Sequence, residues 1–229
     1  MHAGALVHNA ALAVADELAE FRAKRSSRPR PLGSTSRCGS RSRSLKPYPC
    51  GRNLHGLIDA SARARSAHAD RQIERIEVRI DPKALARATL SFPEHVVAAQ
   101  FSIPFAVALS TATGRTSLAD FDAPGNVPAA VKALFARVHV QPHDATPEDQ
   151  ISFTYAGGAK HTESAAGVRL GHPSKPLSRE QIGNKLRDCN GFAGAPLSEQ
   201  SIEALLSAAL RVERLASTTE LTRLLRVEH

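Results

Sequence analysis

Residues 151–169, ISFTYAGGAKHTESAAGVR, decide the fold class. Apolar and polar side chains alternate from Ile151 to Tyr155, a pattern typical of a strand with one buried face. The Gly157-Gly158 pair supplies the backbone freedom that a tight turn requires, and residues 160–169 are predicted to form the returning strand. This stretch therefore predicts an antiparallel β-hairpin.

Further strands and helices are predicted on the N-terminal side of the hairpin. Residues 73–80 alternate isoleucine and valine with charged side chains and predict a strand that ends before Pro82; a second is predicted at 138–141. Helices are predicted at 56–68 and 128–136, and a third is predicted to begin at the cap Ser102 and to end at Gly114. One face of this third helix is predicted to carry Phe101, Phe105, Ala108 and Leu109.

The last third of the chain is predicted to be helical. Ser178 and Gln181 have capping-box spacing, and Gly191 can close the helix that they begin. The next helices are indicated by periodic apolar residues, namely Ile202, Leu205, Leu206 and Ala209, and then Leu221, Leu224 and Leu225. The chain as a whole predicts an α+β fold, with a small, mostly antiparallel sheet, helices packed on it and flanking helices.

The positive charge of the chain is confined to one segment. The formal net charge is +8, but nine of the 30 Lys and Arg residues fall between Arg22 and Lys46, where there is no acidic residue. Outside this segment 21 basic residues face 22 acidic ones, so the charge does not indicate a folded nucleic-acid-binding surface. The alternatives for the basic tract are an RNA-binding tail or a flexible insertion, and the absence of interleaved aromatic residues favours the insertion.

The predicted organisation has three parts. Residues 1–21 predict a helix, residues 22–44 a disordered linker rich in Arg and Ser, and residues 45–229 the α+β domain with its terminal helices. Three widely spaced cysteines favour neither a metal site nor a disulfide framework, and no apolar run is long enough for a membrane span. We therefore expect a cytoplasmic protein with no metal and no membrane partner.

The densest group of reactive side chains lies at residues 45–55, LKPYPCGRNLH. Pro47 and Pro49 stiffen the backbone around Tyr48. Within this loop lie an ammonium, a phenol, a thiol, a guanidinium and an imidazole, which can hold carboxylates and move a proton. The spacing alone also allows a structural turn that leads into a helix.

The same loop resembles a characteristic stretch of the MmgE/PrpD family. The resemblance rests on Lys46–Cys50, His55 and the helix after it, and continues through 76–79, 100–106, the hairpin and 171–178. It covers residues 45–225, about four-fifths of the chain. Members of the family include 2-methylcitrate dehydratase, cis-aconitate decarboxylase and iminodisuccinate epimerase.

The resemblance implies roles for individual residues. It implies that His55, Lys46 and Tyr48 are catalytic, and that Arg52 and His2 contact the substrate. The alternatives are that His55 is a polar residue at a helix start, that Lys46 is solvated and that Tyr48 packs in the core. Cys50 is interpreted as a small buried residue and not as a nucleophile.

The implied function is cofactor-independent elimination of water from a citrate-like acid, as in propionate catabolism by 2-methylcitrate dehydratase. The resemblance implies a di- or tricarboxylate substrate and a homodimer, or pairing with a helical domain. The family's helical domain has no counterpart in these residues, so we expect a truncated lyase with little activity alone. Two other hypotheses stay open: a non-catalytic module that pairs with an intact homologue, and nucleic-acid binding through the basic tract.

Overall fold

The computed structural model describes residues 44–143 and 148–225 of the chain. The chain divides into two compact units, one of residues 48–169 and one that joins residues up to 47 with residues from 170 onward. The helix predicted at 1–21 and, apart from Ser44, the linker predicted at 22–44 lie outside the described residues. No helix within the described ranges is long and apolar enough to cross a membrane.

A four-stranded sheet forms the base of the unit 48–169, in the order β2-β1-β3-β4. Its strands are β1 (Ile73–Ile80), β2 (Val138–Pro142), β3 (Gln150–Tyr155) and β4 (Lys160–Ser164). Strand β1 pairs with β2 in parallel, whereas the pairs β1–β3 and β3–β4 are antiparallel. The predicted mostly antiparallel sheet and its hairpin are confirmed, and Gly157 and Gly158 at the turn have φ of 84° and 81°.

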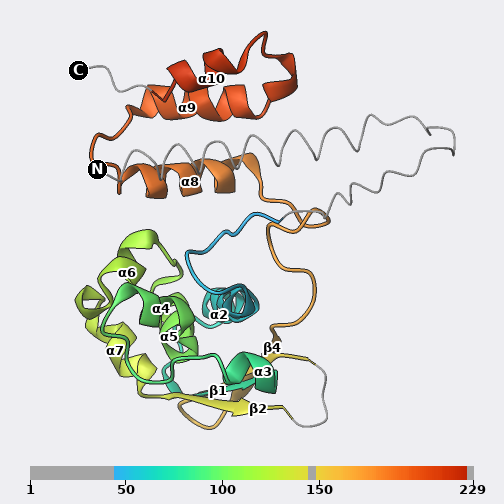
Figure 1. The fold of residues 1–229 in the computed structure, drawn as a ribbon. Helices are drawn as coiled ribbons and strands as arrows, with labels where there is room; N and C mark the ends of the chain where they lie inside the picture. Colours follow the sequence, from blue (N-terminus) through green and yellow to red (C-terminus); the bar gives the residue numbers. More distant parts are fainter. Residues whose placement is uncertain (1–43, 144–147, 226–229) are drawn as a thin grey trace, which may run out of the picture. The chain divides into compact units, whose positions relative to one another are not determined.

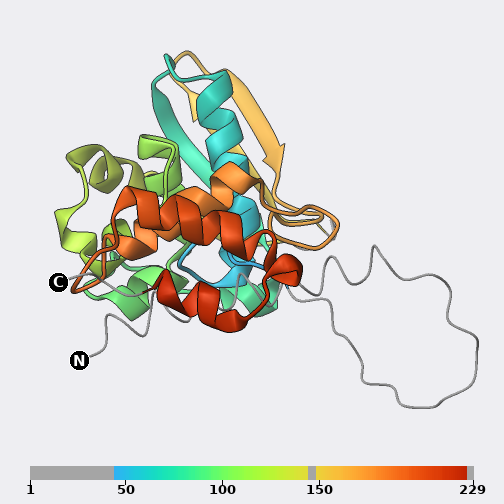
Figure 2. The same cartoon turned by 90° about the horizontal axis from the view of Figure 1, so that it is seen from above.

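The helices of this unit are mostly short and follow one another closely. They are η1 (Arg52–Leu54), α2 (His55–Ala67), α3 (Pro82–Leu85), α4 (Val96–Phe101), α5 (Ile103–Thr113), α6 (Leu118–Asp122), η2 (Pro124–Asn126) and α7 (Ala129–Phe135). Helix α2 contacts β3 and β4, and α5 contacts β2. Figure 1 shows α2 and α5 beside the sheet, and Figure 2 shows α2 lying lengthwise over the strands.

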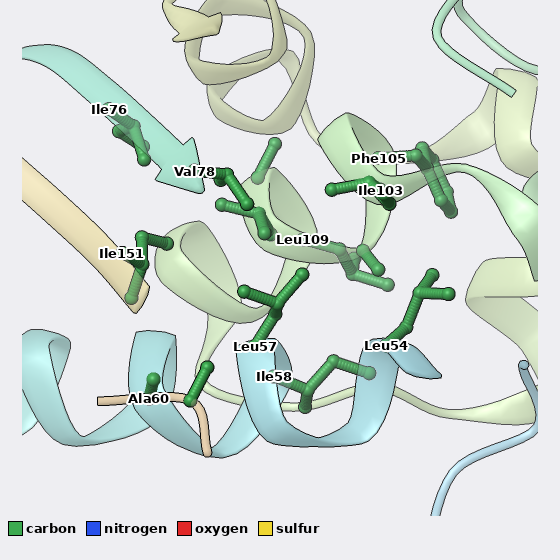
Figure 3. Close-up of a cluster of buried hydrophobic side chains, with 14 of the residues drawn as sticks. Leu54, Leu57, Ile58, Ala60, Ile76, Val78, Ile103, Phe105, Leu109 and Ile151 are labelled. Carbon is green, nitrogen blue, oxygen red and sulfur yellow. The ribbon is translucent and has the colours of Figure 1, made fainter. Parts of the chain in front are cut away.

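The core of this unit lies between the sheet and helices α2 and α5. Alternation in β1 sends Ile76 and Val78 inward, where they meet apolar side chains of both helices and of β3. Figure 3 shows this cluster, with Leu57 of α2 facing Leu109 of α5. Because α2 passes through the core, its first residue is held by packing and not by loop contacts alone.

Helix α5 is buried on all sides and not on one face. Ser102 caps it by accepting a hydrogen bond from the backbone N–H of Phe105 at 3.3 Å, and Gly114 ends it with φ of 70°. Both predicted signals are therefore confirmed. The prediction that Phe101 shares the buried face was wrong: Phe101 ends α4, before the cap, and is 43% exposed.

The described residues of the second unit, 44–47 and 170–225, form three helices and a 3-10 turn. Its elements are α8 (Arg179–Asn190), α9 (Glu199–Ala209), η3 (Val212–Arg214) and α10 (Thr218–Arg223). The capping box of Ser178 and Gln181 is confirmed, with both hydrogen bonds present. Gly191 ends α8 as predicted, although with φ of −61° and not in the left-handed region. Gly171 is left-handed at φ of 84°, and its carbonyl accepts from Leu45 N at 3.0 Å.

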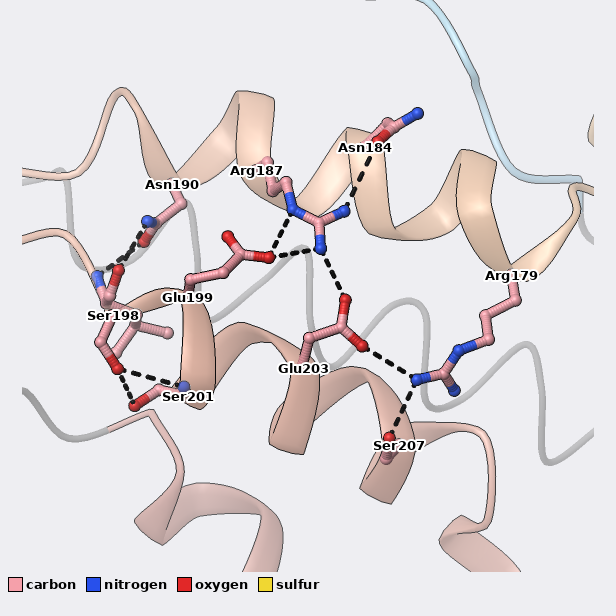
Figure 4. A network of polar contacts seen from close by, with 10 residues as sticks. Arg179, Asn184, Arg187, Asn190, Ser198, Glu199, Ser201, Glu203 and Ser207 are labelled. Atoms are coloured by element: carbon pink, nitrogen blue, oxygen red, sulfur yellow. Dashed lines mark hydrogen bonds and ion pairs between the residues drawn. The ribbon is translucent and has the colours of Figure 1, made fainter.

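A network of ion pairs and a buried pair of hydrogen bonds hold α8 against α9 and the residues before it. Arg187 donates to both Glu199 and Glu203, and Arg179 donates to Glu203 at 3.0 Å (Figure 4). The Asn190 amide donates to Leu197 O at 3.0 Å and accepts from Leu197 N at 2.8 Å. The charged groups are partly exposed, so solvent screens them. The buried Asn190 pair is worth more because it satisfies two backbone groups inside the core.

We expect Asn190→Ala to lower the free energy of unfolding by about 2 kcal/mol, because it leaves the backbone N–H and C=O of Leu197 without hydrogen-bond partners. Urea unfolding followed by circular dichroism measures this loss. Asn184→Ala is the matched control on the same helix, since Asn184 is exposed and makes only a 3.5 Å contact with Arg187. Equal stability of the two variants would contradict the role of the Asn190 pair.

Candidate functional site

The loop at 45–55 leads directly into the first turn of α2. The backbone N–H of Gly51 donates to Gln100 O at 2.9 Å, which ties the loop to α4. The 3-10 turn η1 then passes into α2 without a break, so that His55 is the first residue of the helix. The position of His55 is thus set by a helix that the core holds on several sides.

Tyr48 and His55 come together in the structure. Their rings are 5.2 Å apart, edge to face. The Tyr48 hydroxyl donates to Asp59 Oδ1 at 2.5 Å, and Asp59 lies one helical turn after His55. We call Tyr48, His55 and Asp59 the loop–helix cluster. In it, one tyrosine spans a turn of α2 and contacts the side chains at both ends of that turn.

The cluster fixes the protonation state of Tyr48. Burial, the hydrogen bond to Asp59 and the negative charge of Asp59 raise the pKa of the Tyr48 phenol far above its ordinary value of 10.0. The phenol is therefore a hydrogen-bond donor at neutral pH and not a base. Its proton is directed at Asp59, so Tyr48 orients its neighbours in this arrangement.

The other predicted site residues have different environments. His55 is 1% exposed, so a substrate can reach its ring only if the groups that cover it move. Lys46 is exposed and belongs to the second unit, whereas Arg52 is half-buried in η1. His2 lies outside the described residues. The interpretation of Cys50 as a buried residue is confirmed, because it is 4% exposed and part of the core.

Asp59 was missed in the sequence analysis, although a signal for it was present. A helix was predicted over 56–68, and a residue four positions after His55 lies on the same helical face. A carboxylate at that position could have been assigned to the site. Among the described residues no three His, Cys, Asp or Glu side chains gather as metal ligands would.

Residues 48–209 match the MmgE/PrpD C-terminal domain. The chain belongs to the MmgE/PrpD family. Over 197 residues it is also 28% identical to cis-aconitate decarboxylase from Mus musculus, in an alignment that covers 80% of this chain. The chain spans 39% of the length of that relative.

We expect the Tyr48 phenol to stay protonated in the folded protein at pH values near 10. Burial raises the pKa of Tyr155 as well, against the lowering effect of Arg71. A raised folded-state pKa contributes stability that is complete below the unfolded pKa and is lost as the pH rises through the folded value. Alkaline conditions should therefore destabilise the fold.

A tyrosinate absorbance titration measures the ionisation of the tyrosines. The chain has two tyrosines, so the signal is simple to assign. In urea both should titrate at about pH 10. In the folded chain Tyr155 should titrate above its ordinary pKa, whereas Tyr48 should ionise only as the protein unfolds, and Tyr48→Phe should weaken this alkaline loss of stability. A folded-state titration of Tyr48 at the ordinary pKa would contradict the hydrogen bond to Asp59.

Proposed function

We propose that this chain contributes the loop–helix cluster to the substrate site of a lyase that acts on a citrate-like acid. The observation that carries the proposal is the packing of Tyr48 on His55 at the start of α2, inside the segment that matches the family. The specific reaction proposed is dehydration of 2-methylcitrate. It proceeds without a cofactor, on side chains alone.

The elimination needs a base, an acid and positive charge. A base removes a proton from the carbon next to a carboxylate, and the electron pair of the broken C–H bond forms the new double bond. The hydroxyl on the neighbouring carbon accepts a proton and leaves as water. An imidazole exchanges protons near neutral pH, so His55 is assigned to proton transfer. Lys46 and Arg52, on either side of Tyr48 in the chain, are assigned to the substrate carboxylates.

Tyr48 has a positioning role in this proposal. Its hydroxyl is engaged with Asp59 at 2.5 Å, while its ring supports the His55 imidazole from the edge. Because a raised pKa keeps the phenol protonated, Tyr48 does not compete with His55 for the substrate proton. Tyr48→Phe should therefore reduce the rate less than loss of the imidazole.

The test measures turnover of 2-methylcitrate by the chain alone, and by the chain together with the part of the mouse relative that the chain does not cover. Because the chain spans 39% of the mouse relative, we expect negligible dehydration of 2-methylcitrate by the 229 residues alone. Co-purified with the remaining part of that relative, the chain should form the alkene product. Loss of carbon dioxide from cis-aconitate, the reaction in the relative's name, is assayed in parallel. Turnover of neither substrate by the mixture argues against a lyase.

A second candidate function is a non-catalytic module that pairs with an intact family member. It is favoured by an exposed apolar patch: Leu90, Val97 and Phe101 are 49%, 55% and 43% exposed. Val97 and Phe101 lie one turn apart on α4, and the residue before Leu90 donates its N–H to Phe101 O. Co-elution with an intact family member that Phe101→Ser abolishes, without turnover in the mixture, would support this function.

A further inference from the structure

A pocket of about 180 Å³ lies in the unit 48–169, at the end of α2 that is opposite to His55. Its walls come from the ends of α2, α5 and α7 and from β1 and β3. Twelve residues line it, with three arginines, one histidine and no acidic residue among them. The polar and aromatic residues that matter here are Arg65, His68, Arg71, Thr111, Arg137 and Tyr155.

Two of the arginines are held in place by backbone carbonyls. Arg65 Nη1 donates to Thr111 O at 2.9 Å and to Ala112 O at 2.6 Å, at the end of α5. Arg137 Nη1 donates to Ile73 O at the start of β1. Carbonyl acceptors orient a guanidinium without neutralising its charge, and other N–H groups of each arginine are left for a ligand.

The third arginine and the histidine lie against a buried aromatic ring. The Arg71 guanidinium carbon is 5.7 Å from the centre of the Tyr155 ring, and the His68 ring is 5.2 Å from it. Tyr155 is 2% exposed and provides a rigid wall. Beside it, Thr111 is 4% exposed, and its hydroxyl makes no hydrogen bond within the part of the chain that the structure describes.

No acidic residue lines the pocket, although the negative charge of Glu163 acts on Tyr155 from outside the lining. Within the described ranges, Arg65, Arg71 and Arg137 form no ion pair, whereas Arg63, Arg75, Arg179 and Arg187 do. Like charges gathered around one hollow raise the free energy of the empty site, and a bound anion lowers it. Guanidinium groups match the geometry of carboxylates and phosphates.

We infer that this pocket binds a small multivalent oxyanion, a polycarboxylate or a phosphate. Arg65, which lines the pocket, lies ten residues after His55 on α2, roughly 15 Å away at about 1.5 Å per residue. The pocket is therefore a site distinct from the loop–helix cluster, and the inference does not depend on the proposed lyase activity.

The inference is tested by titrating the purified chain with citrate, with inorganic phosphate and with chloride, followed by calorimetry at low ionic strength. The pocket predicts saturable binding of citrate or phosphate in the millimolar range or tighter, and no comparable binding of chloride. Tighter citrate binding assigns the site to polycarboxylates, and tighter phosphate binding assigns it to phosphates. Absence of saturable binding by either anion, or equal binding of chloride, overturns the inference.

Arg71→Gln removes one positive charge from the pocket, and Arg75→Gln, its matched control, removes one positive charge outside it. Both side chains are exposed, so neither change threatens the fold; Arg75 pairs with Glu77 at 3.1 Å and does not line the pocket. We expect Arg71→Gln to weaken binding about fivefold or more and Arg75→Gln to leave it within about twofold. Equal weakening by both changes would mean that only net charge matters and would refute a built site.

Discussion

Gly56→Ala should destabilise the unit 48–169 by about 3 kcal/mol, a large loss for the addition of one methyl group. A Cβ at position 56 would lie 2.0 Å from the carbonyl oxygen of Ala165 and 3.1 Å from its carbonyl carbon. Both atoms belong to the backbone just after β4, so no side chain can rotate away to make room. The helix or the strand end has to shift, and the core packed between them loosens.

Urea unfolding of Gly56→Ala against the unchanged chain measures this loss. Gly125→Ala is the control, because nothing lies within 4 Å of a Cβ at position 125. That change should leave stability within about 0.5 kcal/mol or raise it slightly, since alanine restricts the unfolded chain. Should Gly56→Ala prove as stable as the control, the close approach of α2 to Ala165 is not a feature of the protein.

His55→Gln should lower turnover of the reconstituted lyase by about a hundredfold or more, the usual contribution of a positioned proton-transfer group. Glutamine keeps a polar side chain of similar size but cannot exchange a proton near neutral pH. The change should lower kcat more than it raises KM, because the imidazole acts on the transition state and not on substrate binding alone.

His139→Gln serves as the control for this prediction. His139 lies on β2, is exposed and has no assigned role. Thermal unfolding of both variants separates a catalytic loss from a folding defect at the buried position 55. If His55→Gln turns over substrate as fast as His139→Gln, His55 does not take part in the proposed reaction.

The elements that local signals specify were predictable from the sequence. Strand β1, the hairpin with Gly157 and Gly158, and the cap at Ser102 each depend on residues a few positions apart. Their backbone preferences and their alternation act within the segment itself. The same holds for the capping box that begins α8.

Features that depend on distant parts of the chain were not predictable in the same way. Strand β2 pairs with β1 in parallel across some sixty residues of intervening chain, and this pairing sets the sheet order. Phe101 was assigned to the buried face because its spacing fitted, but the break at Ser102 places it in a separate helix. Periodicity alone cannot show such a break unless the cap is taken into account.

The candidate functional residues also differ in how far local sequence could predict them. Tyr48 and His55 were chosen from one short loop, and the structure places their rings 5.2 Å apart. Asp59 needed the helical spacing as well. The arginine-lined pocket could not be predicted from local patterns, because Arg65 of α2 and Arg137, between α7 and β2, come together only through tertiary packing.

The placement of the loop–helix cluster in a substrate site is tested by an NMR titration with 2-methylcitrate of the histidine ring signals of the Arg71→Gln chain, co-purified with the remaining part of the mouse relative. We expect the His55 ring signals to shift with a saturable dependence on the acid, Tyr48→Phe to alter this shift, and the His139 signals to stay unaffected. Signals of His68 report separately on the arginine-lined pocket at the other end of α2. A His55 signal that stays unchanged up to saturation of every other site would contradict the placement of the loop–helix cluster in the substrate site.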